Sequence, residues 1–90
     1  MVVRIHPSAD VSKDAKIGEG SSIFHHAQVQ KGARIGNECI IGKGVYVGAD
    51  VKIGNRVKIQ NYVSVYKGLI IEDGVMLGPF SAPKMSLNPI

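Results

Sequence analysis

The chain has 90 residues, of which 44% are hydrophobic and 20% charged, and its net charge is +4. This length leaves room for one domain of ordinary size. Eleven glycines and four prolines are too many for a helical bundle, because helix interiors exclude both residue types. The longest apolar runs fall far short of the roughly 20 residues that cross a bilayer. We therefore expect a single non-helical domain that spans no membrane.

The N-terminal segment and the cysteine content favour a cytoplasmic setting. Residues 1–7 have neither the charged start nor the apolar stretch of a signal peptide. The single cysteine, Cys39, has no partner for an internal disulfide. The mild basic charge suits an anionic partner, but no recognition motif for nucleic acid accompanies it, so no nucleic-acid partner is expected.

An aliphatic residue recurs at every sixth position, beginning at Ile5. The members of this first row are Ile5, Val11, Ile17, Ile23, Val29, Ile35, Ile41, Val47, Ile53, Ile59, Val65, Ile71 and Leu77. Four residues after each member comes a second row of mostly small or branched residues, and we expect both rows to face inward. The second row consists of Ala9, Ala15, Ser21, Ala27, Ala33, Cys39, Val45, Val51, Val57, Val63, Leu69, Val75 and Ser81. Cys39 is therefore interpreted as a packed thiol rather than a nucleophile.

A period of six fits neither the 3.6-residue period of a helix nor simple alternation, but it suits short strands separated by turns. Glycine is frequent just after the first row, and Asn37, Asn55 and Asn61 occupy a turn position where we expect left-handed backbone. The pattern resembles that of hexapeptide-repeat proteins. The resemblance implies an all-β, single-stranded, left-handed parallel β-helix of triangular section, here with about four coils. We expect one domain over residues 1–90, with repeats in 5–82 and an irregular tail at 83–90.

Residues eighteen apart should lie above one another, so the surface divides into three faces whose aliphatic rows begin at Ile5, Val11 and Ile17. The first face is expected to carry all three histidines, together with amides and aromatic rings typical of a polar cleft or an oligomer interface. These residues are His6, His25, His26, Gln28, Tyr46, Gln60, Asn61 and Tyr62.

The second face is expected to carry two columns of basic residues. The columns are Lys16, Arg34 and Lys52, and Lys13, Lys31 and Lys67. Like charges about 5 Å apart repel, so such a ladder indicates either an anion site, for example for coenzyme A phosphates, or a solvated face with splayed side chains. The third face is interpreted as plain solvent surface. Its residues are Glu19, Asn37, Glu38, Asn55, Arg56 and Asp73.

His25 is the best candidate for chemistry, because a neutral imidazole can accept a proton near pH 7. The alternative is a histidine that forms hydrogen bonds across a subunit interface and takes no part in a reaction. His26 should point elsewhere if the strand alternates. Zinc bound between histidines is disfavoured because His6 and His25 lie nineteen residues apart, so no metal is expected.

Four stretches, residues 22–25, 47–48, 58–66 and 72–79, resemble one branch of the hexapeptide-repeat acyltransferases. These are the N-acetyltransferases that act on the 3-amino group of a UDP-linked 2,3-diamino-uronic acid (UDP-2-acetamido-3-amino-2,3-dideoxy-glucuronate). The run Gln60-Asn61-Tyr62-Val63-Ser64-Val65-Tyr66 is the most specific part, since the repeat alone does not require it.

The resemblance implies a homotrimer that binds acetyl-CoA and the amino sugar nucleotide between adjacent β-helices. Its matching residues are His25, Gln60 and Asn61, with His25 accepting the amine proton and the amides orienting the substrate. Tyr62 is a further substrate-binding candidate because its ring can stack on a base, and the alternative is that this ring packs at a subunit interface. Arg34, Lys52 and Lys67 are expected to meet the phosphates of acetyl-CoA.

After Pro79 the chain departs from the family pattern, because Pro83-Lys84-Met85 stand where the family has an asparagine that lines its site. The further coils that supply much of the family's coenzyme A cleft do not follow. An alternative therefore stays open: a non-catalytic trimeric β-helix module for structure or assembly.

Overall fold

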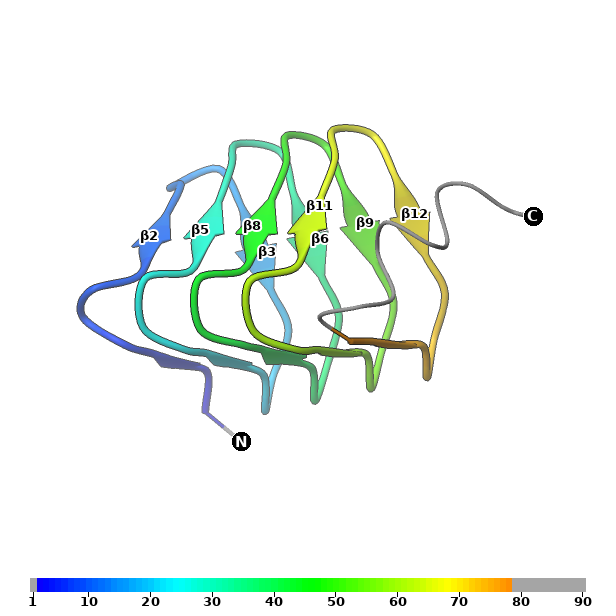
Figure 1. The fold of residues 1–90 in the computed structure, drawn as a ribbon, viewed down its shortest axis with the longest axis horizontal. Helices are drawn as coiled ribbons and strands as arrows, with labels where there is room; N and C mark the ends of the chain where they lie inside the picture. Colours follow the sequence, from blue (N-terminus) through cyan, green and yellow to red (C-terminus); the bar gives the residue numbers. More distant parts are fainter. Residues whose placement is uncertain (1, 79–90) are drawn as a thin grey trace.

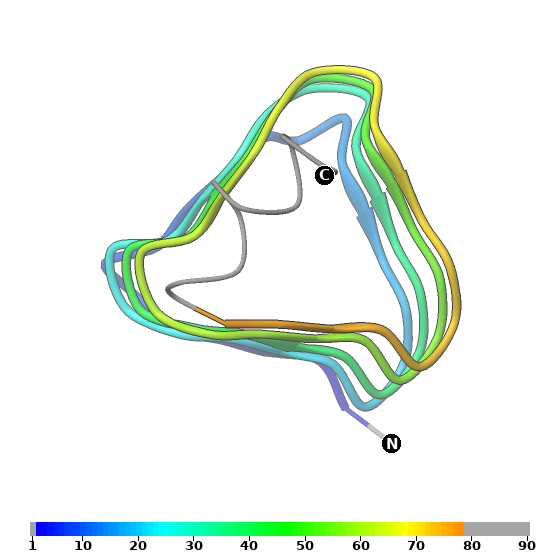
Figure 2. The ribbon, with the colours of Figure 1, turned by 45° about the vertical axis from the view of Figure 1, so that its right-hand side comes forward.

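The computed structural model describes residues 2–78, and every element in this part of the chain is a strand of two residues. Each strand pairs in parallel with the strand eighteen residues away, as Ile5 pairs with Ile23 and Ile41 with Ile59. Figure 1 shows the resulting stack of coils, and Figure 2 shows its triangular section. The expected left-handed parallel β-helix of about four coils is thus confirmed.

The thirteen strands form three sheets, one for each side of the triangle. Sheet 1 consists of β1 (Arg4–Ile5), β4 (Ser22–Ile23), β7 (Ile40–Ile41), β10 (Lys58–Ile59) and β13 (Met76–Leu77). Sheet 2 consists of β2 (Asp10–Val11), β5 (Gln28–Val29), β8 (Tyr46–Val47) and β11 (Ser64–Val65). Sheet 3 consists of β3 (Lys16–Ile17), β6 (Arg34–Ile35), β9 (Lys52–Ile53) and β12 (Ile70–Ile71).

Four residues separate successive strands, and the first three of them form a corner between two sheets. Corner 1, between sheets 1 and 2, comprises residues 6–8, 24–26, 42–44 and 60–62. Corner 2, between sheets 2 and 3, comprises residues 12–14, 30–32, 48–50 and 66–68. Corner 3, between sheets 3 and 1, comprises residues 18–20, 36–38, 54–56 and 72–74.

Both aliphatic rows point into the β-helix, as the repeat predicted. The buried core residues are Ile23, Ala27, Val29, Ala33, Ile35, Cys39, Ile41, Val45, Val47, Val51, Ile53, Val57, Ile59, Val63, Val65 and Leu77. Burial is lower in the first coil, where Ile5 keeps 44% of its surface exposed because it has a neighbouring coil on one side only. Leu69 is also largely exposed. Ser81 and the expected tail at 83–90 lie outside the described residues.

The second residue of each strand faces the core, and the first faces outward. In β9, for example, Lys52 is exposed and Ile53 is buried. The outward residue therefore shares a sheet with the aliphatic residue that follows it. This corrects the expected faces: Lys16, Arg34 and Lys52 lie on sheet 3, not on the face that begins at Val11. Gln28 and Tyr46 likewise lie on sheet 2, not on the face of the histidines.

The left-handed turn residue is the third residue of a corner, so the expectation for Asn37, Asn55 and Asn61 was wrong by one position. Residues with positive φ at this third place are Gly20, His26, Gly32, Glu38, Gly44, Asp50, Arg56, Tyr62, Gly68 and Gly74. Glycine is common there because it has no Cβ to clash in this conformation.

The asparagines of corner 3 connect successive coils. Asn37 Oδ1 accepts a hydrogen bond from the backbone N–H of Glu19 at 3.0 Å, and Asn55 Oδ1 accepts one from Asn37 N–H at 2.8 Å. Asp73 Oδ1 does the same for Asn55 N–H at 2.7 Å. These oxygens satisfy turn N–H groups that the strand ladder leaves free. The interpretation of these residues as plain solvent surface was therefore incomplete, since this column of side chains joins the coils.

Candidate functional site

Corner 1 brings the three histidines together. His6 follows β1 in the first coil, and His25 and His26 follow β4 in the second coil. The ring centroids of His6 and His25 lie 5.4 Å apart, and so do those of His25 and His26. His26 belongs to a turn rather than an alternating strand, so it does not point away from His25 as expected. Its φ is 61°, and its ring lies edge-on to that of His25.

The surroundings of His25 favour an uncharged imidazole. Partial desolvation lowers the pKa of His25 below its usual value of 6.5, and the neighbouring charges of Lys43, His6 and His26 lower it further. The side chain is half-buried and keeps access to solvent. A neutral imidazole at pH 7 can accept a proton, which is the chemistry expected of His25.

The predicted substrate-binding residues Gln60, Asn61 and Tyr62 lie on the same corner, two coils further along the β-helix. Two coil spacings separate them from His25 by roughly 10 Å along the axis. Asn61 Oδ1 already accepts a hydrogen bond from the backbone N–H of Lys43 at 2.9 Å, so the NH₂ of this amide is the group left for a ligand. Tyr62 is exposed, and Gln60 is half-buried.

Lys43, which was not predicted as a site residue, occupies the coil between those of His25 and Asn61. Its Nζ lies 5.4 Å from the ring centroid of Tyr62, which is a cation–π distance. It also lowers the pKa of His25. The signal that could have found it is the eighteen-residue spacing from His25 and Asn61, which puts all three in one column of second turn residues. No carboxylate belongs to corner 1 within residues 2–78.

The predicted phosphate-binding residues lie elsewhere. Lys16, Arg34 and Lys52 form an in-register column on the outer side of sheet 3, with Arg34 paired to both neighbours. Lys67 lies on corner 2, beside sheet 3. Sheet 2 separates corner 1 from corner 2, so a single chain does not bring Arg34, Lys52 and Lys67 next to His25 (Figure 2). Within residues 2–78 none of these cations makes an ion pair.

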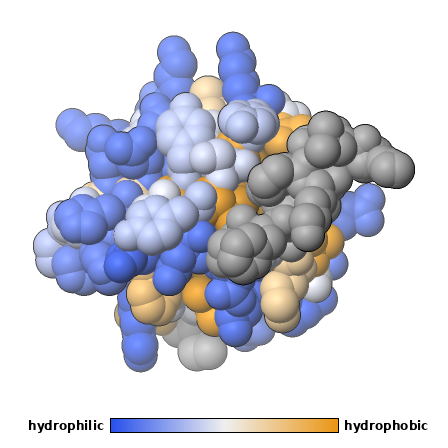
Figure 3. Space-filling model, in the orientation of Figure 1, coloured by the Kyte–Doolittle hydropathy of each residue, from blue (hydrophilic) through white to orange (hydrophobic). Residues whose placement is uncertain are grey.

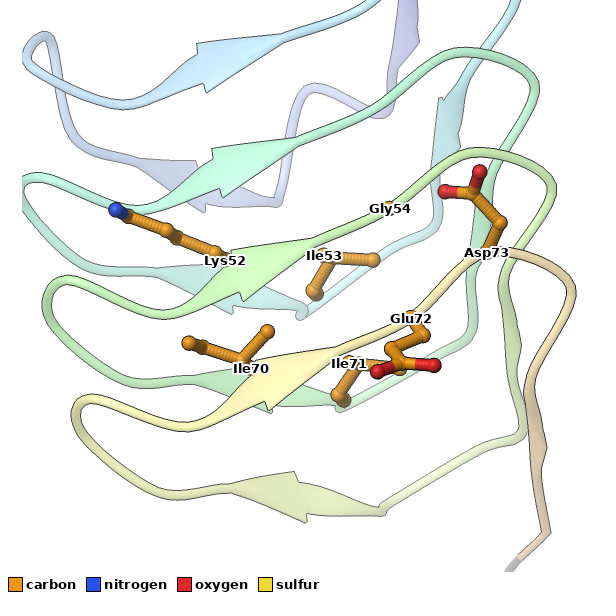
Figure 4. Close-up of a pocket in the computed structure, with 7 residues that line it drawn as sticks. All are labelled: Lys52, Ile53, Gly54, Ile70, Ile71, Glu72 and Asp73. Carbon is orange, nitrogen blue, oxygen red and sulfur yellow. The ribbon is translucent and has the colours of Figure 1, made fainter.

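An open depression of about 500 Å³ lies between β9 and β12 on sheet 3 (Figure 4). Its lining residues are Lys52, Ile53, Gly54, Ile70, Ile71, Glu72 and Asp73. It includes one predicted phosphate ligand, Lys52, but Glu72 and Asp73 add negative charge at its other end. The depression is far from corner 1. The side of the molecule seen in Figure 3 is largely hydrophilic, with small apolar areas between the polar side chains.

Residues 2–78 contain no group of three or more histidine, cysteine, aspartate or glutamate side chains arranged to bind a metal ion. The same residues contain no helix with the length and hydropathy needed to cross a lipid bilayer.

Solved structures of other proteins share this fold, among them three acetyltransferases. The acetyltransferase domain of PglB from Neisseria gonorrhoeae matches with a TM-score of 0.65 and 24% identity, covering 84% of this chain and 49% of that one. A perosamine N-acetyltransferase from Caulobacter crescentus, solved in complex with CoA and GDP-perosamine, matches with a TM-score of 0.59 and 29% identity, covering 87% and 43%. Serine acetyltransferase isoform 3 from Entamoeba histolytica, in complex with cysteine, matches with a TM-score of 0.67 and 18% identity, covering 91% and 36%.

The chain spans less than half the length of these three solved chains. No curated protein matches its sequence. The family model described as bacterial transferase hexapeptide (six repeats) matches residues 14–49 and 50–82, which is most of the chain. Together with the observed six-residue period and the three-sheet β-helix, this match shows that the chain belongs to the bacterial transferase hexapeptide family.

Proposed function

We propose that the protein is an acetyl-CoA-dependent N-acetyltransferase that acts on the amino group of a sugar nucleotide. The observation that carries this proposal is His25, which is accessible, half-buried and electrostatically biased toward the neutral form. The similarity to a perosamine N-acetyltransferase solved with CoA and GDP-perosamine supports the choice of donor and acceptor. We place the reaction in the cytoplasm.

In the proposed reaction the acceptor amine attacks the thioester carbonyl of acetyl-CoA. A C–N bond forms, the C–S bond breaks, and coenzyme A leaves as the thiolate. His25 accepts the proton that the amine loses and returns it to the thiolate, so the enzyme is unchanged after one turnover. Most of the rate enhancement comes from holding both reactants in one geometry.

Two other sets of residues complete the site. The NH₂ of Asn61 and the amide of Gln60 orient the acceptor on the same corner as His25, and the exposed ring of Tyr62 offers a stacking surface for the nucleotide base. The charges of Arg34, Lys52 and Lys67 suit the phosphates of acetyl-CoA, because their mutual repulsion decreases when an anion lies between them.

One chain separates these two sets by the width of sheet 2. We therefore place the active site between neighbouring copies of a homotrimer, where corner 1 of one copy faces the basic residues of the next. Monomeric protein should then bind acetyl-CoA weakly and turn over no substrate. Analytical ultracentrifugation run alongside the binding assay tests this arrangement.

Isothermal titration of acetyl-CoA into the protein, at low and moderate salt, tests the donor site. We expect saturable binding near one per chain that weakens with salt, since phosphate contacts are screened. Arg34→Ala/Lys52→Ala should lose this binding, while Lys58→Ala, an exposed cation on sheet 1, should keep it. Thiol release with GDP-perosamine and with the UDP-linked diamino-uronate then tests the acceptor, and His25→Gln should abolish most of it.

A second candidate is a non-catalytic trimeric β-helix module for structure or assembly. It is favoured by the separation of the histidine and basic sets within the chain. Absence of acetyl-CoA binding at both salt concentrations, in a sample that is trimeric by ultracentrifugation, would reject the transferase and support this module.

A further inference from the structure

The imidazole of His25 is packed between two other rings. The plane of His6 is tilted by 55° to that of His25, and the plane of His26 by 69°, each at a centroid distance of 5.4 Å. These are favourable distances and angles for aromatic pairs. Interactions that hold the rings of His6 and His26 in place therefore also restrain the orientation of the His25 ring.

Ser8 forms hydrogen bonds with both of these neighbours. Its backbone N–H donates to His6 Nδ1 at 3.1 Å, so this nitrogen must carry a lone pair and the ring proton must be on Nε2. The Ser8 hydroxyl lies 2.9 Å from the same Nδ1 and must therefore donate to it. The hydroxyl oxygen in turn accepts a hydrogen bond from the backbone N–H of His26 at 3.1 Å.

This arrangement departs from most of the other corners. At seven later third-turn positions the backbone N–H donates to a backbone carbonyl of the preceding coil. Gly44 N–H, for example, donates to the His25 carbonyl at 3.1 Å, and Tyr62 N–H donates to the Lys43 carbonyl at 2.8 Å. At His26 the hydroxyl of Ser8 takes the place of that carbonyl. One side chain thus holds both the left-handed turn that carries His26 and the ring of His6.

We propose that Ser8 is a positioning residue that orients the imidazole of His25 through His6 and His26. Ser8 touches no reacting atom, and its catalytic consequence rests on the proposed function. Its structural consequence does not: His6 should be the Nε2–H tautomer, and the three rings should keep one arrangement only while the Ser8 hydroxyl is present.

Three variants separate this role from a general loss of structure. Ser8→Ala removes the hydroxyl, and Ser8→Thr retains it. Ser64→Ala is the matched control, because Ser64 is exposed on β11 and its hydroxyl makes no hydrogen bond within the described residues. Far-UV circular dichroism verifies that each variant keeps the β-helix.

The first readout is NMR of the histidine rings, which needs no activity. In the wild-type protein we expect the ¹⁵N shifts of His6 to show an unprotonated Nδ1, with NOEs from the ring of His25 to both neighbours. Ser8→Ala should keep this tautomer, because the backbone N–H of residue 8 still donates to His6 Nδ1, but it should weaken both NOEs. Ser8→Thr and Ser64→Ala should keep both NOEs. A His6 Nδ1–H tautomer in the wild type, or unchanged His25 resonances in Ser8→Ala, would overturn the proposal.

The second readout is the thiol-release assay with acetyl-CoA and GDP-perosamine. We expect Ser8→Ala to lower kcat by roughly ten- to a hundredfold with little change in the KM for acetyl-CoA, since misplacing a catalytic group costs rate rather than binding. Ser8→Thr should restore most of kcat. Equal kcat values for Ser8→Ala and the wild type would refute the positioning role. A wild-type protein that binds no acetyl-CoA would instead refute the proposed function, and the NMR result would still decide whether Ser8 orients the ring.

Discussion

Replacing one isoleucine of the sheet 1 core with alanine should destabilise the protein by an amount that depends on the coil. Ile41 in β7 has no exposed surface, whereas Ile5 occupies the same place in the first coil and is 44% exposed. The change to alanine removes three carbon groups, worth about 2.4 kcal/mol of transfer free energy when fully buried. A cavity between two coils adds to this, so we expect Ile41→Ala to cost about 3–4 kcal/mol. For Ile5→Ala the buried fraction gives about 1.3 kcal/mol, with no closed cavity.

Urea unfolding followed by circular dichroism measures both variants against the wild type. All three should be compared at one protein concentration, because association of copies contributes to apparent stability. The slope of the transition should stay constant, so that midpoint shifts report free energy. Equal losses for the two variants, or a larger loss for Ile5→Ala, would refute the reasoning that the second to fourth coils carry the closed core.

Two further predictions concern the packing of coils and the charge of the candidate site. Gly48→Ala should lower the Tm by on the order of 10 °C in scanning calorimetry, since overpacking of this kind typically costs about 2 kcal/mol. The added Cβ would lie 2.6 Å from the backbone N of Lys67 in the next coil. An unchanged Tm would contradict this coil spacing. Because the pKa of His25 is lowered in the folded protein, the unfolded chain binds a proton at this residue more readily. Above about pH 6.5 the imidazole is neutral in both states and does not affect the free energy of unfolding. As the pH falls from there through the folded pKa, protonation of the unfolded chain lowers the stability of the protein. His25→Gln should therefore lose less stability than the wild type between pH 7.5 and pH 5, as measured by urea unfolding, and a steeper loss in the variant would show that the assigned direction of the pKa shift is wrong.

Much of the candidate site could be predicted from spacing alone. Residues eighteen apart fall in one column of a parallel β-helix, so His25 and Asn61 were correctly expected on one side of the molecule. The same arithmetic also places Lys43 between them, but it gives no sign that Lys43 lowers the pKa of His25 or lies over the ring of Tyr62. Those effects depend on side-chain directions, which the spacing of residues in a sequence does not give.

The errors have one physical cause, which is the place of the bend within each hexapeptide. The residue before each aliphatic position faces outward on the same strand, so Arg34 belongs with Ile35 on sheet 3. The prediction instead grouped Arg34, with Lys16 and Lys52, on the face that begins at Val11, which is sheet 2. The left-handed residue was misplaced by one position for the same reason, and Asn37 serves as a hydrogen-bond acceptor instead.

The sequence by itself predicted two inward-facing rows on short strands separated by turns, because its aliphatic residues recur strictly every six positions. The left-handed, triangular β-helix followed from its resemblance to hexapeptide-repeat proteins. The sequence also identified the inward position of Cys39 and the candidate role of His25. The tertiary structure alone decided which side chains meet. Hydrogen bonds such as those of Ser8 to His6 and His26 join residues in different coils, and their directions follow from turn conformations of one or two residues. A repeat fixes the positions of residues along and around the β-helix, but the local φ and ψ angles of each corner decide where their polar groups point.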